Sequence, residues 1–294
     1  MEPTVVFVYD DGPIADYETA YPVHQRFDAP ACIAVVSEWL GTSPGPLRRV
    51  LGRGTEYLDE SHVRELADAG WEVLSHGAAH RPLDATRTTA RADRGDRVLH
   101  VETDIHGREQ GDTLVVETVH GETRVTVGRA SHLPGRTAIV LRDPLVESVP
   151  DGASVRFAEE VVRDELETSK RDLEALGVSV DDVALPYSRY GPTDREVVPE
   201  VYDGVANAAL GGVNIDPTDP YDLRRQYLGR DALTDEQLER FLETVRDRNA
   251  LALFGGHSHR HVDADRIADA LGLAREFEIR VTTLRDALAS LPDD

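Results

Sequence analysis

The sequence predicts an α/β fold in which parallel strands alternate with helices and a small antiparallel β subdomain interrupts the chain. Short apolar runs alternate with helix-like segments over the first 85 residues, and the same pattern returns after residue 155. Short alternating segments bounded by glycine or aspartate fill the stretch between them. Right-handed crossovers through a helix make consecutive strands parallel. The pattern therefore favours a barrel or a doubly wound sheet that carries an insertion.

The N-terminal part reads as repeated strand and helix units. We expect, in order, a strand at Thr4–Tyr9, a helix at Asp16–Phe27, a strand at Ala31–Val36, a helix at Asp59–Asp68 and a strand at Trp71–Leu74. Asp59 is a good N-cap and Gly70 a good C-terminal stop for the second helix.

The pattern changes near residue 88, where glycine and aspartate begin to separate short alternating runs. We expect strands at Arg97–Thr103, Thr113–Val119, Thr123–Val127 and Thr137–Leu141. Such spacing predicts an antiparallel subdomain of about 60 residues. The predicted domains are a barrel made of residues 1–88 and 154–294 and an inserted β-rich subdomain at residues 89–153.

Helix-like sequence resumes at Val155–Leu176, and Gly177 is its expected stop. Further strands are expected at Asp182–Leu185, Gly204–Ala208, Arg225–Leu228, Leu251–Phe254 and Ile279–Thr282. Helices are expected at Thr234–Arg248, Asp263–Leu271 and Thr283–Leu291.

The charge of the chain is strongly acidic. Fifty-five acidic residues against 32 basic residues give a net charge of −23, and Lys170 is the single lysine. An acidic surface that uses arginine in place of lysine is suited to concentrated salt, where its self-repulsion is screened. We therefore expect an extreme halophile as the source. The same charge argues against nucleic acid or an anionic membrane as a partner.

Composition also bears on location and redox chemistry. No run of about 18 apolar residues occurs, so no membrane span is expected. The first residues lead directly into a strand without the basic and apolar segments of a secretory signal, which predicts a cytoplasmic protein. Cys32 is the single cysteine, so the chain has no internal disulfide, and its apolar surroundings predict a buried, inert thiol.

Two adjacent carboxylates stand where the first predicted strand ends. Asp10 and Asp11 repel each other there, and a bound cation is the simplest way to offset their charge. The strand that ends at Leu74 leads into His76 and His80. One carboxylate and two imidazoles with an open position for water form the ligand set of a catalytic metal. Together the two motifs predict a metal-dependent hydrolase.

Each motif alone has a simpler explanation. Residues 10–13, Asp-Asp-Gly-Pro, are ordinary turn sequence, and two histidines four positions apart are often unrelated. Both motifs follow strand-like runs, however, and barrel enzymes collect their catalytic groups at the C-terminal ends of strands. That placement favours the metal site, and a chain without any metal is the plain alternative.

The order of these features resembles the polysaccharide deacetylase family, the NodB-homology or carbohydrate esterase family 4 group. Residues 9–13, Tyr-Asp-Asp-Gly-Pro, match its first motif, and residues 76–80, His-Gly-Ala-Ala-His, match its second. The resemblance covers residues 4–88 and 155–288, and it implies a distorted (β/α)7 TIM-like barrel. It also implies that Asp10 is the general base and that Asp11, His76 and His80 bind a divalent metal, with Zn2+ the expected ion.

The later motifs match less completely. Residues 184–187, Ala-Leu-Pro-Tyr, lack the usual arginine of the third motif but keep Tyr187, whose backbone N–H is expected to stabilise the oxyanion. Residues 219–225 resemble the segment that supplies a later arginine in similar members, so Arg225 is expected to orient the base. Residues 251–257 match the last motif, whose histidine is the general acid and falls on His257; a solvated loop accounts for the two histidines that follow.

The resemblance implies a hydrolase that removes N-acetyl groups from amino sugars or from oligo- and polysaccharides, with a metal-bound water as nucleophile. The missing arginine leaves a second possibility, hydrolysis of another non-peptide C–N bond in a cyclic imide, a ureide or a formyl-amino sugar. A third is a non-catalytic carbohydrate-binding module that uses the β insertion. The expected partner is a carbohydrate or another small-molecule amide substrate, and a homo-oligomer is a further possibility.

Overall fold

The computed structural model describes residues 2–44, 54–103, 110–118, 120–133 and 136–291. Contacts within the chain divide it into two compact units. The first consists of residues 1–78, 168–188 and 202–294, and the second of residues 79–167 and 189–201. The domain boundaries predicted from the sequence stay a prediction.

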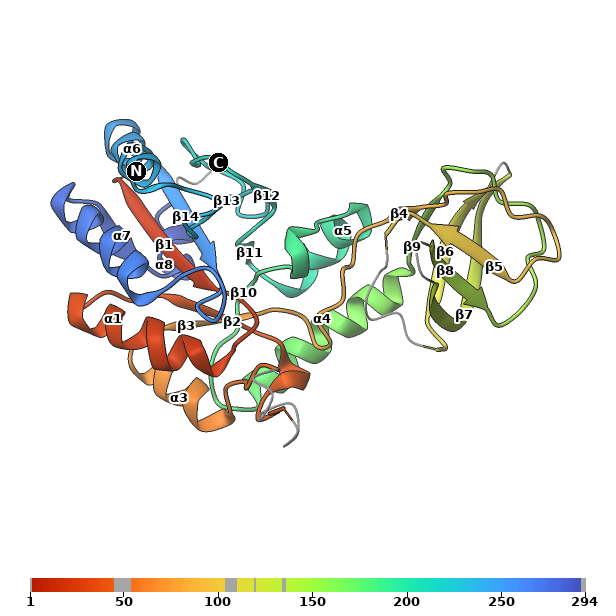
Figure 1. The fold of residues 1–294 in the computed structure, drawn as a ribbon, viewed down its shortest axis with the longest axis horizontal. Helices are drawn as coiled ribbons and strands as arrows, with labels where there is room; N and C mark the ends of the chain where they lie inside the picture. The colour runs from red at the N-terminus through yellow and green to blue at the C-terminus, as the bar shows by residue number, and fades with distance from the viewer. Residues whose placement is uncertain (1, 45–53, 104–109, 119, 134–135, 292–294) are drawn as a thin grey trace. The chain divides into compact units, whose positions relative to one another are not determined.

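A curled parallel sheet forms the first unit, in the order β11-β10-β3-β2-β1-β14-β13-β12, with β15 also paired to β1 (Figure 1). Its strands are β1 (Thr4–Tyr9), β2 (Cys32–Val35), β3 (Glu72–Ser75), β10 (Asp182–Val183), β11 (Gly204–Val205), β12 (Ala209–Leu210), β13 (Arg224–Tyr227), β14 (Leu251–Gly256) and β15 (Arg280–Thr282). The first and one of the last strands pair in parallel, with Thr4 opposite Leu251 and Tyr9 opposite Gly256. The predicted parallel α/β fold is confirmed.

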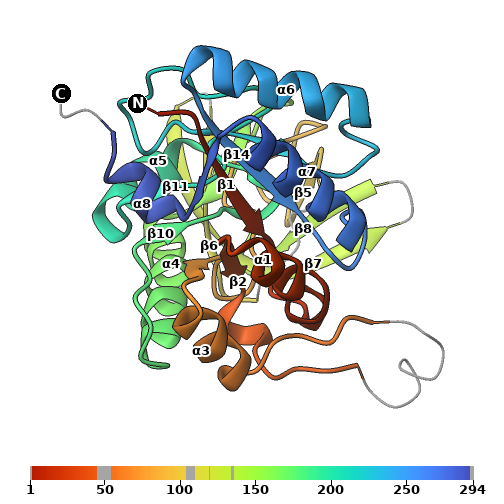
Figure 2. The ribbon, with the colours of Figure 1, turned by 90° about the vertical axis from the view of Figure 1, so that its left-hand side faces the viewer.

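Both faces of this sheet are buried, as is usual for parallel strands. Every residue of β1 and of β14 is buried. One face contributes Val6, Ala34 and Leu253 to an apolar cluster that α8 completes with Leu284. Helices lie around the outside (Figure 2), and their bounds are α1 (Tyr21–Phe27), α3 (Glu60–Asp68), α6 (Asp235–Arg248), α7 (Ala264–Glu276) and α8 (Leu284–Leu288).

Side-chain caps set the starts of these helices. The Asp59 carboxylate accepts hydrogen bonds from the backbone N–H groups of Ser61 and His62 at the start of α3. Thr234 and Asp263 cap α6 and α7 in the same way. These bonds satisfy backbone donors that the first turn of a helix leaves open. The three predicted helix starts are confirmed.

Two predicted helices differ from the structure. Residues 16–27 form a π-helical turn, η1 (Asp16–Ala20), followed by α1, in place of one helix. The predicted helix Val155–Leu176 begins too early, because β9 (Ser154–Phe157) pairs antiparallel with β6 before α4 (Glu159–Glu174) starts. One further helix, α5 (Pro192–Val201), was not predicted.

The second unit carries a six-stranded antiparallel sheet in the order β4-β9-β6-β7-β8-β5. Besides β9, its strands are β4 (Thr86–Arg87), β5 (Val98–Val101), β6 (Thr113–Thr118), β7 (Gly121–Leu133) and β8 (Arg136–Leu141). The predicted antiparallel sheet is confirmed, although Val119 of one predicted strand lies outside the described residues. Gly128 marks a shift of register in β7, where a Cβ atom would lie 2.9 Å from the carbonyl carbon of Leu141.

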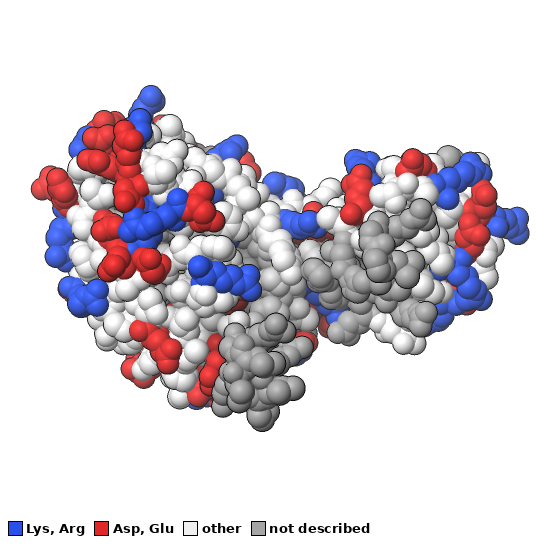
Figure 3. Space-filling view, in the orientation of Figure 1, with Lys and Arg blue, Asp and Glu red and all other residues white. Residues whose placement is uncertain are grey.

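Two further observations concern the charge on one face and the character of the helices. Acidic and basic side chains are interspersed on the face drawn in Figure 3. Among the helices of the described residues, none combines the length and the apolar character that crossing a membrane requires.

Candidate metal centre and active site

The site lies where β1, β3, β10, β13 and β14 reach their C-terminal ends, the edge at which parallel sheets collect functional groups. Asp10 and Asp11 follow β1 directly, and both are buried. Asp11 has a φ of 76° and Gly12 a φ of 67°, so the chain turns sharply after the strand. The left-handed region is costly for a residue other than glycine and is often found at functional sites. The turn lets two adjacent carboxylates face different partners.

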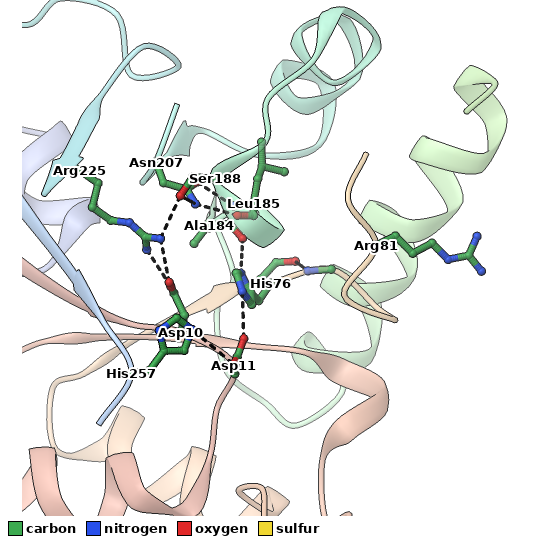
Figure 4. A network of polar contacts seen from close by, with 12 residues as sticks. Asp10, Asp11, His76, Arg81, Ala184, Leu185, Ser188, Asn207, Arg225 and His257 are labelled. Atoms are coloured by element: carbon green, nitrogen blue, oxygen red, sulfur yellow. Dashed lines mark hydrogen bonds and ion pairs between the residues drawn. The ribbon is translucent and has the colours of Figure 1, made fainter. Parts of the chain in front are cut away.

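A carboxylate and two imidazoles come together beside this turn. One ligand atom from each of Asp11, His76 and His80 lies within 4.8 Å of the others. Nε2 of His76 lies 3.5 Å from Oδ1 of Asp11. Nδ1 of His76 lies 2.6 Å from the carbonyl oxygen of Ala184 (Figure 4). Because a carbonyl only accepts hydrogen bonds, Nδ1 carries the proton and Nε2 is directed at Asp11. A metal-binding histidine typically donates its other ring N–H to a carbonyl in this way.

The electrostatics of His76 agree with that arrangement. Burial acts to lower its pKa, but the hydrogen bond to Asp11 and the charges of Asp10 and Asp11 outweigh burial and raise the pKa above the ordinary value. The pocket therefore attracts positive charge, which a proton or a cation can supply.

Arg225 neutralises the other carboxylate. Its Nη1 donates to Oδ1 of Asp10 at 2.7 Å and its Nη2 donates to Oδ2 at 2.8 Å (Figure 4). Burial alone would raise the pKa of Asp10, yet the charges of Arg225 and His76 hold it below the usual range. Gly255 on β14 makes room for the guanidinium, since a Cβ atom there would lie 2.6 Å from Nε of Arg225.

His257 follows β14, and its Nε2 lies 3.4 Å from Oδ2 of Asp11. Burial lowers the pKa of His257 below its ordinary value, although Asp10 and Asp11 act in the opposite direction. Of the two histidines that follow, His259 packs its ring 5.7 Å from that of His257, and His261 lies 3.8 Å from Asp231. Of these three histidines, His257 is the one within ion-pair distance of a motif carboxylate.

The loop after β10 carries Tyr187, which has a φ of 60° and a half-exposed side chain. Asn207 braces this loop: its Oδ1 accepts from the backbone N–H of Leu185 at 2.8 Å, and its Nδ2 donates to the carbonyl of Leu185 at 2.7 Å. Sequence reasoning missed Asn207. The signal that could have indicated it is a polar residue directly after the short apolar run of residues 204–206.

Six of the seven residues singled out in the sequence lie on loops that follow the strands at this edge, and Arg225 lies within β13, from which its guanidinium reaches Asp10. The structure brings together Asp10, Asp11, His76, His80, Arg225 and His257, and it places Tyr187 on the neighbouring loop. A pocket of about 260 Å3 opens beside His257 and is lined by Tyr227, Gly256, Arg260 and Val262 among others. The chemical roles of these residues stay predictions.

Comparison with known proteins finds one family model that is similar to the part that holds both N-terminal motifs. The sequence model described as Polysaccharide deacetylase matches residues 1–103. The match covers about a third of the chain and includes both N-terminal motifs. None of the curated proteins matches the sequence.

Solved structures of the deacetylase family extend the likeness to the whole chain. The Xyl-CE4 domain of a multidomain xylanase from the hindgut metagenome of Trinervitermes trinervoides is 11% identical, with a TM-score of 0.50 over 98% of this chain and 91% of that one. A deacetylase solved with its substrate is 10% identical, with a TM-score of 0.50 over 100% and 94% of the two chains. A CE4 family pseudoenzyme from Bacillus anthracis is 11% identical, with a TM-score of 0.50 over 98% and 66%.

At these identities the likeness establishes the fold, and the predicted TIM-like barrel class is confirmed. Because one neighbour is a pseudoenzyme, the fold alone does not decide whether a chain is active. Activity depends on the residues of the site.

Proposed function

We propose that this chain is a metal-dependent deacetylase that removes N-acetyl groups from amino sugars, oligosaccharides or polysaccharides. The observation that carries the proposal is that the carboxylates of Asp10 and Asp11 have different partners. Asp10 is held by the guanidinium of Arg225, while Asp11 faces imidazoles on two sides. A binding module needs no such ionised, oriented carboxylate beside a ligand set.

The donor set fits a divalent cation with borderline-soft character. One carboxylate and two imidazoles are the ligands that zinc takes in catalytic sites, and the orientation of His76 supports binding through Nε2. Asp11, His76 and His80 would hold the ion. When bound, the ion supplies a Lewis acid that polarises an acyl carbonyl and lowers the pKa of a water molecule towards neutrality.

Asp10 has the properties of the proton acceptor. Its lowered pKa keeps it ionised at neutral pH, and the two hydrogen bonds from Arg225 fix the plane of the carboxylate. A general base must be within hydrogen-bond reach of the proton that it removes, and orientation supplies much of that advantage. Arg225 would thus orient the Asp10 carboxylate, the role that the arginine of the third motif has in the family that the chain resembles.

His257 and Tyr187 complete the proposed reaction. His257, beside Asp11, would donate a proton to the departing amine. The backbone N–H of Tyr187 would stabilise negative charge on the carbonyl oxygen, a contribution of about 3 kcal/mol for one donor in such sites. The products would be acetate and a free amino sugar.

Acetate release from a panel of N-acetylated sugars and short oligosaccharides tests the proposal. The assay is run in high salt on the chelator-treated protein, with and without added Zn2+. We expect acetate release that depends on the added ion. The same panel includes a cyclic imide, a ureide and a formyl-amino sugar, and turnover confined to these three would replace deacetylation by hydrolysis of another C–N bond.

A further inference from the structure

Asp16 is a buried carboxylate close to the proposed site, and no sequence motif accounts for it. Its side chain is fully buried on the π-helical turn η1, five residues after Asp11. Its Oδ1 accepts a hydrogen bond from the hydroxyl of Ser258. Among the described residues, its Oδ2 has no hydrogen-bond partner. Burying a carboxyl group costs free energy unless a hydrogen bond compensates for the lost water. The hydrogen bond from Ser258 provides part of that compensation.

The partner of Asp16 lies in the turn that carries the proposed acid. Ser258 stands between His257 and His259 in the chain. The turn closes on the carbonyl of His257, which accepts from the backbone N–H groups of Arg260 at 3.1 Å and of His261 at 3.1 Å. The Ser258–Asp16 bond therefore ties a locally closed turn to the segment that follows the Asp10-Asp11 motif.

This tie fixes the separation of two functional groups that are far apart in the sequence. Asp16 follows the strand that presents Asp11, and Ser258 follows the strand that presents His257. Those strands, β1 and β14, are paired in parallel, and Nε2 of His257 lies 3.4 Å from Oδ2 of Asp11. The Ser258–Asp16 bond adds a second link between the segments that follow the two strands.

We infer that Asp16 is a positioning residue that, through Ser258, holds the His257 imidazole facing Asp11. The inference rests on the proposed function for its catalytic meaning, but the tie itself can be measured without any substrate. The role does not require a charge on Asp16, because a carboxyl oxygen accepts a hydrogen bond in either protonation state. Burial raises the pKa of Asp16 well above the usual range, and the charges of Asp10 and Asp11 add to that increase despite the bond from Ser258.

The kinetic test compares Asp16→Ala, Ser258→Ala and the double variant with the wild type. We expect each single variant to lower kcat roughly tenfold with little change in KM, since a misplaced acid loses part of its contribution. The double variant should fall no further than either single one, because all three break the same bond. Asp16→Asn keeps a neutral acceptor and should stay within about threefold of the wild type. Glu18→Ala, an exposed change on the same turn, is the control.

Amide hydrogen exchange of residues 257–262 is the second readout, and it needs no turnover. Faster exchange in Asp16→Ala and Ser258→Ala, but not in Asp16→Asn or Glu18→Ala, supports the tie. Unchanged exchange in both alanine variants, or additive losses of kcat, would overturn it. If the wild type releases no acetate while exchange follows the expected pattern, the positioning contact stands and the proposed function fails.

Discussion

Asp10 and Asp11 are neighbours in the chain, yet the positive φ of Asp11 turns their carboxylates towards different partners. Two like charges this close destabilise each other unless each is compensated. Arg225 compensates Asp10 with two hydrogen bonds, and His76 and His257 flank Asp11. The arrangement separates a carboxylate whose pKa is lowered by Arg225 from one that faces two imidazoles.

The pKa of His257 leads to a prediction about pH. Burial lowers this pKa, and a bound cation would lower it further, so the protonated acid is lost as pH rises through a value below the ordinary value of about 6.5. We expect kcat/KM to decline as pH rises through this lowered pKa. His257→Asn should lower kcat by roughly 10²-fold or more and should lose this descending limb. A variant that keeps the same limb would assign it to another group.

Single residues divide into those that the sequence could indicate and those that it could not. Asp10, Asp11, His76 and His257 stand at the ends of recognisable strands, so topology predicts that they meet. Arg225 was reached through a family resemblance, and the room that Gly255 leaves for it is visible only in space. Asp16 and Ser258 are ordinary polar residues 242 positions apart, and nothing in their local sequence points to a contact.

At the scale of elements, the starts of β3 and β10 carry a second, unrelated pair of buried acids. Glu72 and Asp182 are both buried, and Glu72 accepts a hydrogen bond from the backbone N–H of Arg285 at 2.9 Å. Burial and the charge of Glu72 raise the pKa of Asp182 to about 9. The pair therefore holds one shared proton at neutral pH.

This pair predicts how stability depends on pH. The folded pKa of Asp182 lies above its unfolded value, so its contribution is present below about pH 4 and is lost as pH rises towards about 9. Asp182→Asn cannot lose that proton and should flatten the decline in Tm between about pH 5 and about pH 9. Glu72→Gln should also flatten it, because it removes the neighbouring charge. Thermal unfolding across this range is the measurement, and an unchanged slope in both variants would contradict the shared proton.

Elements that are marked in the sequence by a capping residue or by an apolar run were predicted well. The starts of α3, α6 and α7 follow from capping residues, and the buried strands follow from their apolar runs. The predicted start of the helix at Val155 was wrong, because residues 154–157 form β9 and pair with β6 before α4 begins. The helix α5 was missed because it contains Pro192 and Pro199, although proline is compatible with the first turn of a helix.

For the whole molecule, periodicity distinguished the parallel sheet from the antiparallel one, because side chains buried on both faces read as apolar runs and half-buried ones alternate. Periodicity carries no information on the substrate. A halophilic source, a cytoplasmic location and a possible homo-oligomer stay predictions.

The Asp10→Asn variant tests the account most directly, with bound zinc and acetate release measured on the same sample. Asp10 is not one of the three proposed ligands, so we expect the variant to bind as much zinc as the wild type. Its kcat for acetate release should fall by roughly 10²- to 10⁴-fold, the contribution of a general base. Asp28→Asn, an exposed change, is the matched control and should leave both values unchanged. Loss of zinc in Asp10→Asn, or turnover near that of the wild type, would contradict the assignment of Asp10 as the base beside a metal held by Asp11, His76 and His80.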